Sequence, residues 1–143
     1  MIEIIRSAWE WTGLKPAAII SSNPFGNLLV RDEVGAYWRI RPEELSCSVV
    51  ATNEVEYEKL RADPEFTLDW EMSKMVEAAR QKHGQLPAGR SYCLKIPAVL
   101  GGEYAIDNIS TITTDEMHSF AGNVAFQIKD SPDGQKIRFK IEP

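Results

Sequence analysis

Apolar residues near the start of the chain recur at helical spacing. Ile2, Ile5 and Trp9 fall on one stripe of a helix over residues 2–12, and Gly13 follows it. Apolar side chains at these intervals are typical of an amphipathic helix that packs on a core. A glycine after the last periodic residue is a common helix end. The pattern therefore predicts an N-terminal helix that ends at Gly13.

A series of short strand-like segments follows. After an apolar run at 17–20 and a turn rich in Asn, Pro and Gly, residues 27–31 and 36–41 each have the composition of a strand. Residues 32–35 between them have the length of a hairpin connection and end in glycine. Residues 47–51 predict a further strand. The short links between these segments favour antiparallel pairing.

Two helices with capping signals are predicted in the middle of the chain. Asn53 can cap a helix over 54–61. Asp63 and Pro64 suit the N-cap and the first turn of a second helix, which ends at 83–84. The apolar stripe of this second helix comprises Leu68, Met72, Met75, Val76 and Ala79. We expect Met75→Asp to unfold the protein, because an unpaired buried charge costs several kcal/mol.

The next segment contains a glycine pair. Residues 91–96 predict a strand that a proline terminates. Gly101 and Gly102 then form a turn, which is followed by short strands around Ala105 and over 108–112. We expect one of the two glycines to adopt a backbone geometry that side chains resist, and its role to be structural.

A capping box opens the last predicted helix. Thr113 and Glu116 have the spacing at which a threonine and a glutamate cap a helix start reciprocally. The helix places Met117, Phe120, Ala121, Val124 and Ile128 on one side. Residues 136–142 alternate between apolar and polar side chains, which predicts a final strand.

Strands and helices in this mixed order predict an α+β fold. We expect one domain over 1–143, with a largely antiparallel or mixed sheet packed against about three to four helices. A soft internal boundary is expected near 62–64. The predicted core includes Leu68, Met72, Met75, Val76, Leu94, Ile96, Phe120, Val124 and Phe139.

Composition is that of a soluble globular protein. The chain has 143 residues, of which 43% are hydrophobic and 26% are charged. No window approaches the roughly 18 consecutive apolar residues of a membrane helix. The first residues include acids and lack the small-residue cleavage site of a secretion signal. These features predict a cytoplasmic protein that does not associate with membranes.

Acidic residues outnumber basic ones, and they concentrate in one stretch. The chain has 21 Asp and Glu against 16 Lys and Arg, a net charge of −5. This balance disfavours nucleic acid as a partner, because phosphate is bound by clustered Lys and Arg. Within 53–71 lie seven acidic and two basic residues. A solvated helix face explains such a stretch, and so does an acidic patch that steers a basic partner. The candidate partner-binding residues are Glu54, Glu56, Tyr57, Glu58, Glu65, Asp69 and Glu71.

Residue types that carry metal or nucleophilic chemistry are sparse. His83 and His118 lie far apart, and Cys47 and Cys93 are solitary members of strand-like runs. No spacing typical of a zinc site is present, and buried free thiols are the expected state of the cysteines. A Cys–His pair that meets only in space stays open. The sequence therefore predicts no catalytic residue, no metal, no cofactor and a protein that is not an enzyme.

Two groups of motifs, taken in order, resemble a known family. The first consists of residues 23–29 (Asn-Pro-Phe-Gly-Asn-Leu-Leu), Asp32, Gly35 and residues 37–43. The second consists of Gly84, Leu86, Tyr92, Lys95, Pro97, Leu100, Gly101, Gly102, Tyr104 and Asn108. Together they resemble the C-terminal domain of the Tdi-type immunity proteins of bacterial type VI secretion systems, most strongly over 67–108 and more loosely over 23–66. The structural motif positions are Phe25, Gly26, Trp38, Gly101, Gly102 and Tyr104.

The resemblance implies a cytoplasmic immunity protein. Such a protein binds a co-encoded effector, here expected to be a DNase with a basic surface, and neutralises it by occlusion. Longer members carry an additional N-terminal domain, for which only the residues before 23 remain in this chain. The early tryptophan and the Phe-Gly turn add a looser likeness to the Smi-type immunity superfamily. The family motifs imply no toxin-contact residue.

Two other functions fit the sequence. Trp9, Trp11, Trp38 and Trp70 are numerous enough to line the pocket of a small ligand-binding domain or enzyme, although large aromatic residues are more common in cores. A scaffold or regulatory interaction domain with a non-toxin partner is a third, weaker alternative.

Overall fold

The chain begins with a helix that packs on a β-sheet. The computed structural model describes residues 1–130. In it, α1 (Ile2–Trp9) continues into a 3₁₀ turn (Glu10–Thr12) and stops at Gly13, where φ is 95°. Side chains resist this left-handed geometry and glycine does not, so the predicted helix end is confirmed.

Four antiparallel strands form the larger sheet, in the order β1-β2-β3-β4. The strands are β1 (Pro16–Ser22), β2 (Leu28–Asp32), β3 (Tyr37–Arg41) and β4 (Ser46–Ala51). A 3₁₀ turn, η2 (Pro42–Glu44), joins β3 to β4. Val30 lies opposite Trp38 in the register of the β2–β3 hairpin. The three strands predicted from the sequence are therefore confirmed, and the apolar run at 17–20 belongs to a fourth.

The β2–β3 hairpin is closed by Asp32. Its carboxylate accepts hydrogen bonds from the backbone N–H groups of Val34 (3.0 Å) and Ala36 (2.8 Å) and from Trp38 Nε1 (2.9 Å). Burial alone raises the pKa of Asp32, but these hydrogen bonds outweigh it and hold the pKa below its ordinary value. Gly35 completes the turn with a φ of 90°. The motif residue Trp38 thus fixes the hairpin.

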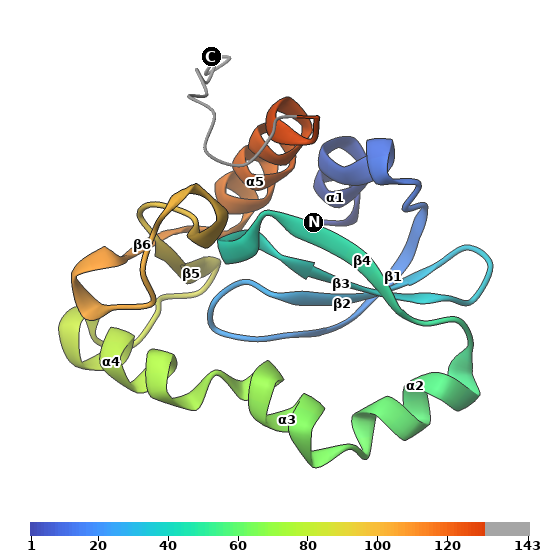
Figure 1. The fold of residues 1–143 in the computed structure, drawn as a ribbon, viewed down its shortest axis with the longest axis horizontal. Coiled ribbons are helices and arrows are strands. Elements are labelled where there is room, and N and C mark those ends of the chain that lie inside the picture. Colours follow the sequence, from blue (N-terminus) through green and yellow to red (C-terminus); the bar gives the residue numbers. More distant parts are fainter. Residues whose placement is uncertain (131–143) are drawn as a thin grey trace.

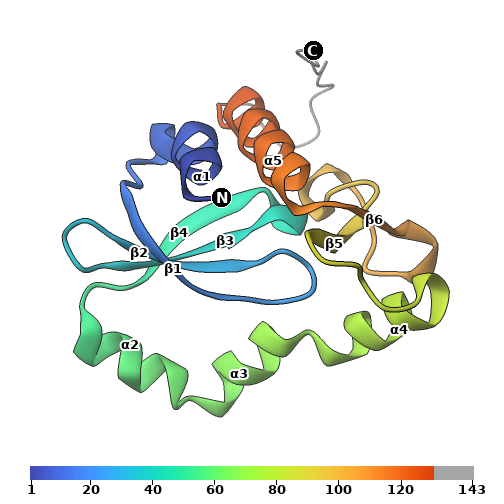
Figure 2. The ribbon, with the colours of Figure 1, turned by 180° about the vertical axis from the view of Figure 1, so that it is seen from behind.

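Three helices form an arc below the larger sheet (Figures 1 and 2). They are α2 (Glu54–Arg61), α3 (Pro64–Glu71) and α4 (Ser73–His83). The single helix predicted to run from Asp63 to residues 83–84 is therefore wrong. It breaks at Met72, which adopts a left-handed conformation with a φ of 48° and separates α3 from α4.

A second, two-stranded sheet and the last helix complete the described fold. β5 (Arg90–Leu94) pairs antiparallel with β6 (Ile109–Thr113), and α5 (Thr114–Ile128) packs beside α1. The predicted cap at Thr113 is confirmed, because Thr113 Oγ1 accepts a hydrogen bond from the Glu116 N–H at 3.3 Å. The reciprocal contact of the capping box differs, since the Glu116 carboxylate accepts from the Thr113 hydroxyl at 2.8 Å. The short strand predicted around Ala105 is wrong. The chain there forms two 3₁₀ turns, η3 (Ala98–Leu100) and η4 (Ile106–Asn108).

Three clusters of buried side chains hold these layers together. The first joins α1 and α5 to one face of the larger sheet, through residues such as Trp9, Val30 and Val124. The second joins α4 to β5 and β6, and it includes Phe25 from the β1–β2 loop. The third joins α2 and α3 to the opposite face of the larger sheet, around Tyr37. The arrangement is a single compact α+β domain, as predicted.

The predicted core is partly correct. Val76, Leu94 and Val124 are buried, and Met72 and Met75 are partly buried. Leu68, Ile96 and Phe120 were predicted in the core but are 71%, 53% and 45% exposed. Leu68 is exposed because the break at Met72 turns α3 out of the helical phase of α4. Phe139 and the strand predicted over 136–142 lie outside the described residues. Within residues 1–130, no helix is long and apolar enough to cross a bilayer.

Candidate functional site

The acidic stretch predicted from the sequence lies exposed on α2 and α3. Asn53 Oδ1 accepts from the Glu56 N–H at 2.9 Å, and Asp63 Oδ1 accepts from the Glu65 N–H at 3.0 Å. These caps fix the starts of the two helices and confirm the capping predictions. Asp63 and Asp69 are exposed, and so are five glutamates, Glu54, Glu56, Glu58, Glu65 and Glu71. We refer to these five glutamates as the acidic face.

Two carboxylates of the acidic face have partners within the chain. Glu56 Oε1 accepts from the backbone N–H and the hydroxyl of Thr52, both at 2.7 Å. These bonds lower the pKa of Glu56. Glu58 lies 3.1 Å from Arg61 Nη2 in an exposed ion pair, which contributes little because water screens it. The carboxylates of the acidic face therefore remain open to solvent.

Tyr57 does not belong to this exposed surface, although the sequence placed it there. The side chain is 7% exposed and stacks on Tyr37, with ring centroids 4.1 Å apart. Burial raises the pKa of the Tyr57 hydroxyl. Its ring joins α2 to the larger sheet, so the acidic face has no aromatic anchor at this position.

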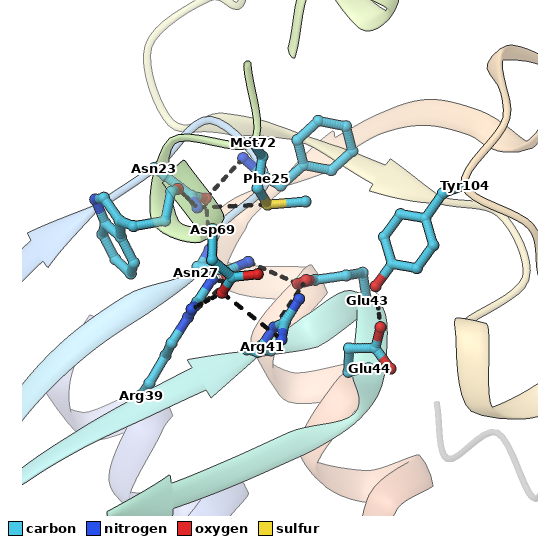
Figure 3. A network of polar contacts seen from close by, with 11 residues as sticks. Asn23, Phe25, Asn27, Arg39, Arg41, Glu43, Glu44, Asp69, Met72 and Tyr104 are labelled. Carbon is cyan, nitrogen blue, oxygen red and sulfur yellow. Dashed lines mark hydrogen bonds and ion pairs between the residues drawn. The ribbon is translucent and has the colours of Figure 1, made fainter. Parts of the chain in front are cut away.

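The side chain of Asp69 is 53% exposed, but its carboxylate is paired with residues of the larger sheet (Figure 3). Its carboxylate forms an ion pair with Arg39 and lies 4.0 Å from Arg41 Nη1. The Arg39 guanidinium also faces the aromatic rings of α3, at 5.2 Å from the Trp70 centroid and 5.9 Å from the Phe66 centroid. Asp69 is thus a tether between α3 and the sheet. It differs in this from the other acids that the sequence grouped with it.

Arg39 belongs to a buried polar network that the sequence analysis missed (Figure 3). Asn27 Oδ1 accepts from Arg39 Nε (3.2 Å) and Nη2 (2.8 Å), and Asn27 Nδ2 donates to Glu43 Oε1 (2.6 Å). Arg41 Nε lies 3.5 Å from Glu43 Oε2. Burial raises the pKa of Glu43, although Arg41 and Asn27 oppose the shift. The sequence signal for this network was Arg39 itself, a charged residue that stands between the apolar residues Trp38 and Ile40 of a predicted strand.

The Asn-Pro-Phe-Gly-Asn turn connects this network to the rest of the fold. Asn23 Oδ1 accepts from the N–H groups of Phe25 (3.0 Å) and Asn27 (3.1 Å), while Asn23 Nδ2 donates to Trp70 O (2.8 Å). Phe25 is fully buried in the cluster beneath α4. Gly26 has a φ of 71°, and its carbonyl oxygen lies 2.8 Å from His118 Nε2. The turn therefore acts as a structural junction.

The two histidines each contact the backbone, and the two cysteines are free thiols. His83 and His118 each contact a backbone carbonyl oxygen, that of Ile109 at 2.9 Å and that of Gly26 at 2.8 Å. Burial lowers the pKa of His118 to about 4. Cys47 and Cys93 are free and partly buried, and burial raises the pKa of Cys47 to about 12. Among residues 1–130, no group of three or more His, Cys, Asp or Glu side chains is arranged to hold a metal ion.

The second glycine motif builds a rigid loop over residues 95–108. Gly101 has a φ of 94°, which confirms the predicted backbone geometry. At Gly102 the reason for glycine is space, since an added Cβ would lie 1.7 Å from Ile96 O. The hydroxyl of Tyr104 donates to Glu44 Oε1 and so joins the loop to η2. Burial and the hydrogen bond to Glu44 raise the pKa of Tyr104.

Comparison with known proteins places these features in a family. No curated protein matches the sequence. The crystal structure of Atu4351 from Agrobacterium tumefaciens is similar in fold, with a TM-score of 0.58 at 15% identity over 85% of this chain and 62% of that chain. This chain therefore spans less than two thirds of that protein.

The sequence match to a family model is more specific than this similarity in fold. A family model described as "T6SS immunity protein Tdi1, C-terminal" matches residues 51–124, which run from the end of β4 into α5. The match covers more than half of the chain and includes α2, α3 and the 95–108 loop. The protein therefore belongs to the family of type VI secretion immunity proteins defined by the C-terminal region of Tdi1.

Proposed function

We propose that this protein binds a cognate type VI secretion effector and neutralises it in the cytoplasm of the cell that makes both. The observation that carries the proposal is the family match over 51–124. The matched region holds the acidic face, the tether formed by Asp69 and the 95–108 loop. The acidic face and the 95–108 loop are exposed surfaces, and the Asp69 tether holds in place α3, which carries part of the first of them.

The cognate toxin is, in this proposal, a nuclease that acts on DNA. A nuclease must present Lys and Arg to the phosphate backbone, so its active face is positively charged. The acidic face of α2 and α3 has the opposite charge. Opposite charges raise the rate of encounter between two proteins, while a smaller set of buried anchors supplies most of the affinity.

Neutralisation would act by occlusion. A bound immunity protein keeps DNA out of the toxin's active site and consumes nothing in doing so. Inhibition is therefore stoichiometric, and it reaches completion at one immunity protein per toxin when the complex is tight.

The test is a titration with the purified toxin encoded beside the gene of this protein. We expect DNA cleavage to fall linearly with added protein and to stop at equimolar ratio, and we expect an inactivated toxin to co-purify with it. Failure of the two proteins to bind would refute the proposal. Binding to a toxin that cleaves another substrate would refute only the nuclease assignment. Turnover of a substrate by this protein alone would favour the enzyme alternative.

A further inference from the structure

The 95–108 loop is held rigidly by hydrogen bonds from within. Asn108 Oδ1 accepts from the Ile96 N–H (3.0 Å), and Asn108 Nδ2 donates to Ile96 O (2.9 Å) and Glu103 O (3.0 Å). From α4, Lys82 Nζ donates to Ile106 O at 2.9 Å. These contacts, together with the close packing at Gly102, give the loop one defined shape.

This rigid loop presents apolar side chains to solvent. Ile96, Val99, Tyr104 and Ile106 are between 42% and 53% exposed. Single exposed apolar residues are ordinary on a protein surface, but several on one short ordered loop are typical of an interaction site. A pre-ordered loop also loses little conformational entropy when a partner binds.

A cavity of about 280 Å³ opens beside the loop. Its walls come from η2, β5, β6 and the first half of α5, and they include Leu45, Leu94, Lys95, Met117 and Phe120. Pockets for drug-sized molecules begin at about 300 Å³, so this cavity suits one large side chain better than a free ligand. Phe120, which is 45% exposed, extends the apolar surface at its mouth.

The charges within the loop itself are acidic on balance, although Lys82 of α4 also reaches it. Glu103 and Asp107 are exposed within the loop, and Lys95 is its single basic residue. Tyr104 joins the loop to Glu44, and Figure 3 shows Arg41 and Glu43 between this contact and Asp69 of α3. The loop is thus next to the network that tethers α3.

We propose that the 95–108 loop and its cavity are the anchor site for the toxin, whose entering side chain is apolar or aromatic and is flanked by Lys or Arg. The inference rests on the proposed function and adds a second role to it. The acidic face accelerates the encounter, and the loop holds the complex together.

Substitutions on the loop separate these two roles kinetically. We expect Val99→Glu and Ile106→Glu each to weaken binding of the inactivated toxin at least about tenfold, and together at least about a hundredfold, through faster dissociation. The added glutamates increase attraction to a basic toxin, so a loss of affinity would report the lost apolar contact. Val34→Glu is the matched control, because Val34 is 88% exposed on the distant β2–β3 turn and the charge change is the same.

Thermal unfolding of each variant and the milder Val99→Ala test whether the fold is intact. A loop variant that melts like the wild type but dissociates faster supports the anchor. If the wild type binds the toxin and the double loop variant binds equally well, the anchor assignment fails while the proposed function stands. If the wild type does not bind the toxin, both fail. A wild-type dimer in sedimentation that Val99→Glu dissolves would also overturn the assignment, since the loop would then bind a second copy of the chain.

Discussion

Asn27 connects two buried charged side chains, Arg39 and Glu43, each of which also has an ion-pair partner in Asp69 or Arg41. Its amide accepts from Arg39 and donates to Glu43, and both charged residues are no more than 5% exposed. A single neutral side chain therefore satisfies a cation and an anion at once. Removal of one member of such a network takes a hydrogen-bond partner from the other buried groups, so their desolvation is no longer fully offset.

Asn27→Ala is accordingly expected to lower the free energy of unfolding by about 3 kcal/mol. Urea denaturation at neutral pH measures the change. Asn123→Ala is the matched control, because Asn123 is exposed on α5, and it should change stability by less than about 0.5 kcal/mol. Equal effects of the two substitutions on the free energy of unfolding would show that the Asn27 network does not stabilise the fold.

His118 makes stability depend on pH. Its side chain is fully buried, and burial lowers its pKa from 6.5 to about 4. Between these values the unfolded chain binds a proton that the folded protein does not, so stability falls as the pH drops from 6.5 toward 4. The loss attributable to this residue is about 2 kcal/mol at pH 5.

His118→Gln isolates this contribution. Glutamine can donate an amide hydrogen to Gly26 O, as His118 Nε2 is placed to do, but it does not titrate. The expected result is a flatter dependence of unfolding free energy on pH between 7 and 5, measured by urea titrations at several pH values. A variant that loses stability on acidification as steeply as the wild type would contradict the assignment.

At the scale of elements, the break between α3 and α4 has a tertiary cause. Asn23 Nδ2 donates to Trp70 O (2.8 Å) and lies 3.6 Å from Met72 Sδ, so a residue distant in sequence occupies the end of α3. The break also lets Arg39 contact the aromatic face of α3. Apolar spacing alone predicted one continuous helix because nothing local marks the stop.

Two acidic substitutions on the predicted stripe therefore have opposite outcomes. Val76→Asp buries an unpaired charge in α4, where Val76 is 8% exposed, and should cost several kcal/mol. Leu68→Asp lies in α3 at 71% exposure and should change stability by less than about 0.5 kcal/mol. Met75 is partly buried, so Met75→Asp should fall between them. Melting temperatures of the three variants give the order, and a large loss for Leu68→Asp would mean that the two helices are continuous.

Local signals were predictable and long-range ones were not. The caps at Asn53, Asp63 and Thr113 depend on residues two or three positions away, and all three are confirmed. The polar network joins Arg39 to partners 12 and 30 positions away, and no periodicity encodes such pairings. The same limit applies to the candidate site: the acidic residues were visible as a charge run, but which of them face solvent depends on packing.

At the scale of the whole molecule, the acidic face should govern how fast the toxin arrives. Reversal of Glu54, Glu56 and Glu58 to lysine is expected to slow association about tenfold at low salt and to reduce its salt dependence. Stopped-flow mixing with the inactivated toxin measures both. Reversal of the exposed Glu10, Glu33 and Glu77 changes net charge equally and is the control. If both triple variants associate at the same rate, overall charge rather than this face steers the encounter.

Phe25 has a consequence for how such proteins diversify. It comes from the β1–β2 loop, yet its side chain is buried beneath α4 with Tyr92, and Pro24 O accepts the Tyr92 N–H at 2.9 Å. The region that defines the family begins only at residue 51, so part of its core is encoded upstream of it. Recombination at that boundary would transfer the proposed toxin-binding surface without the residue that supports it. New specificities should therefore arise by point substitution on the surface, or by exchange of a segment that begins before residue 24.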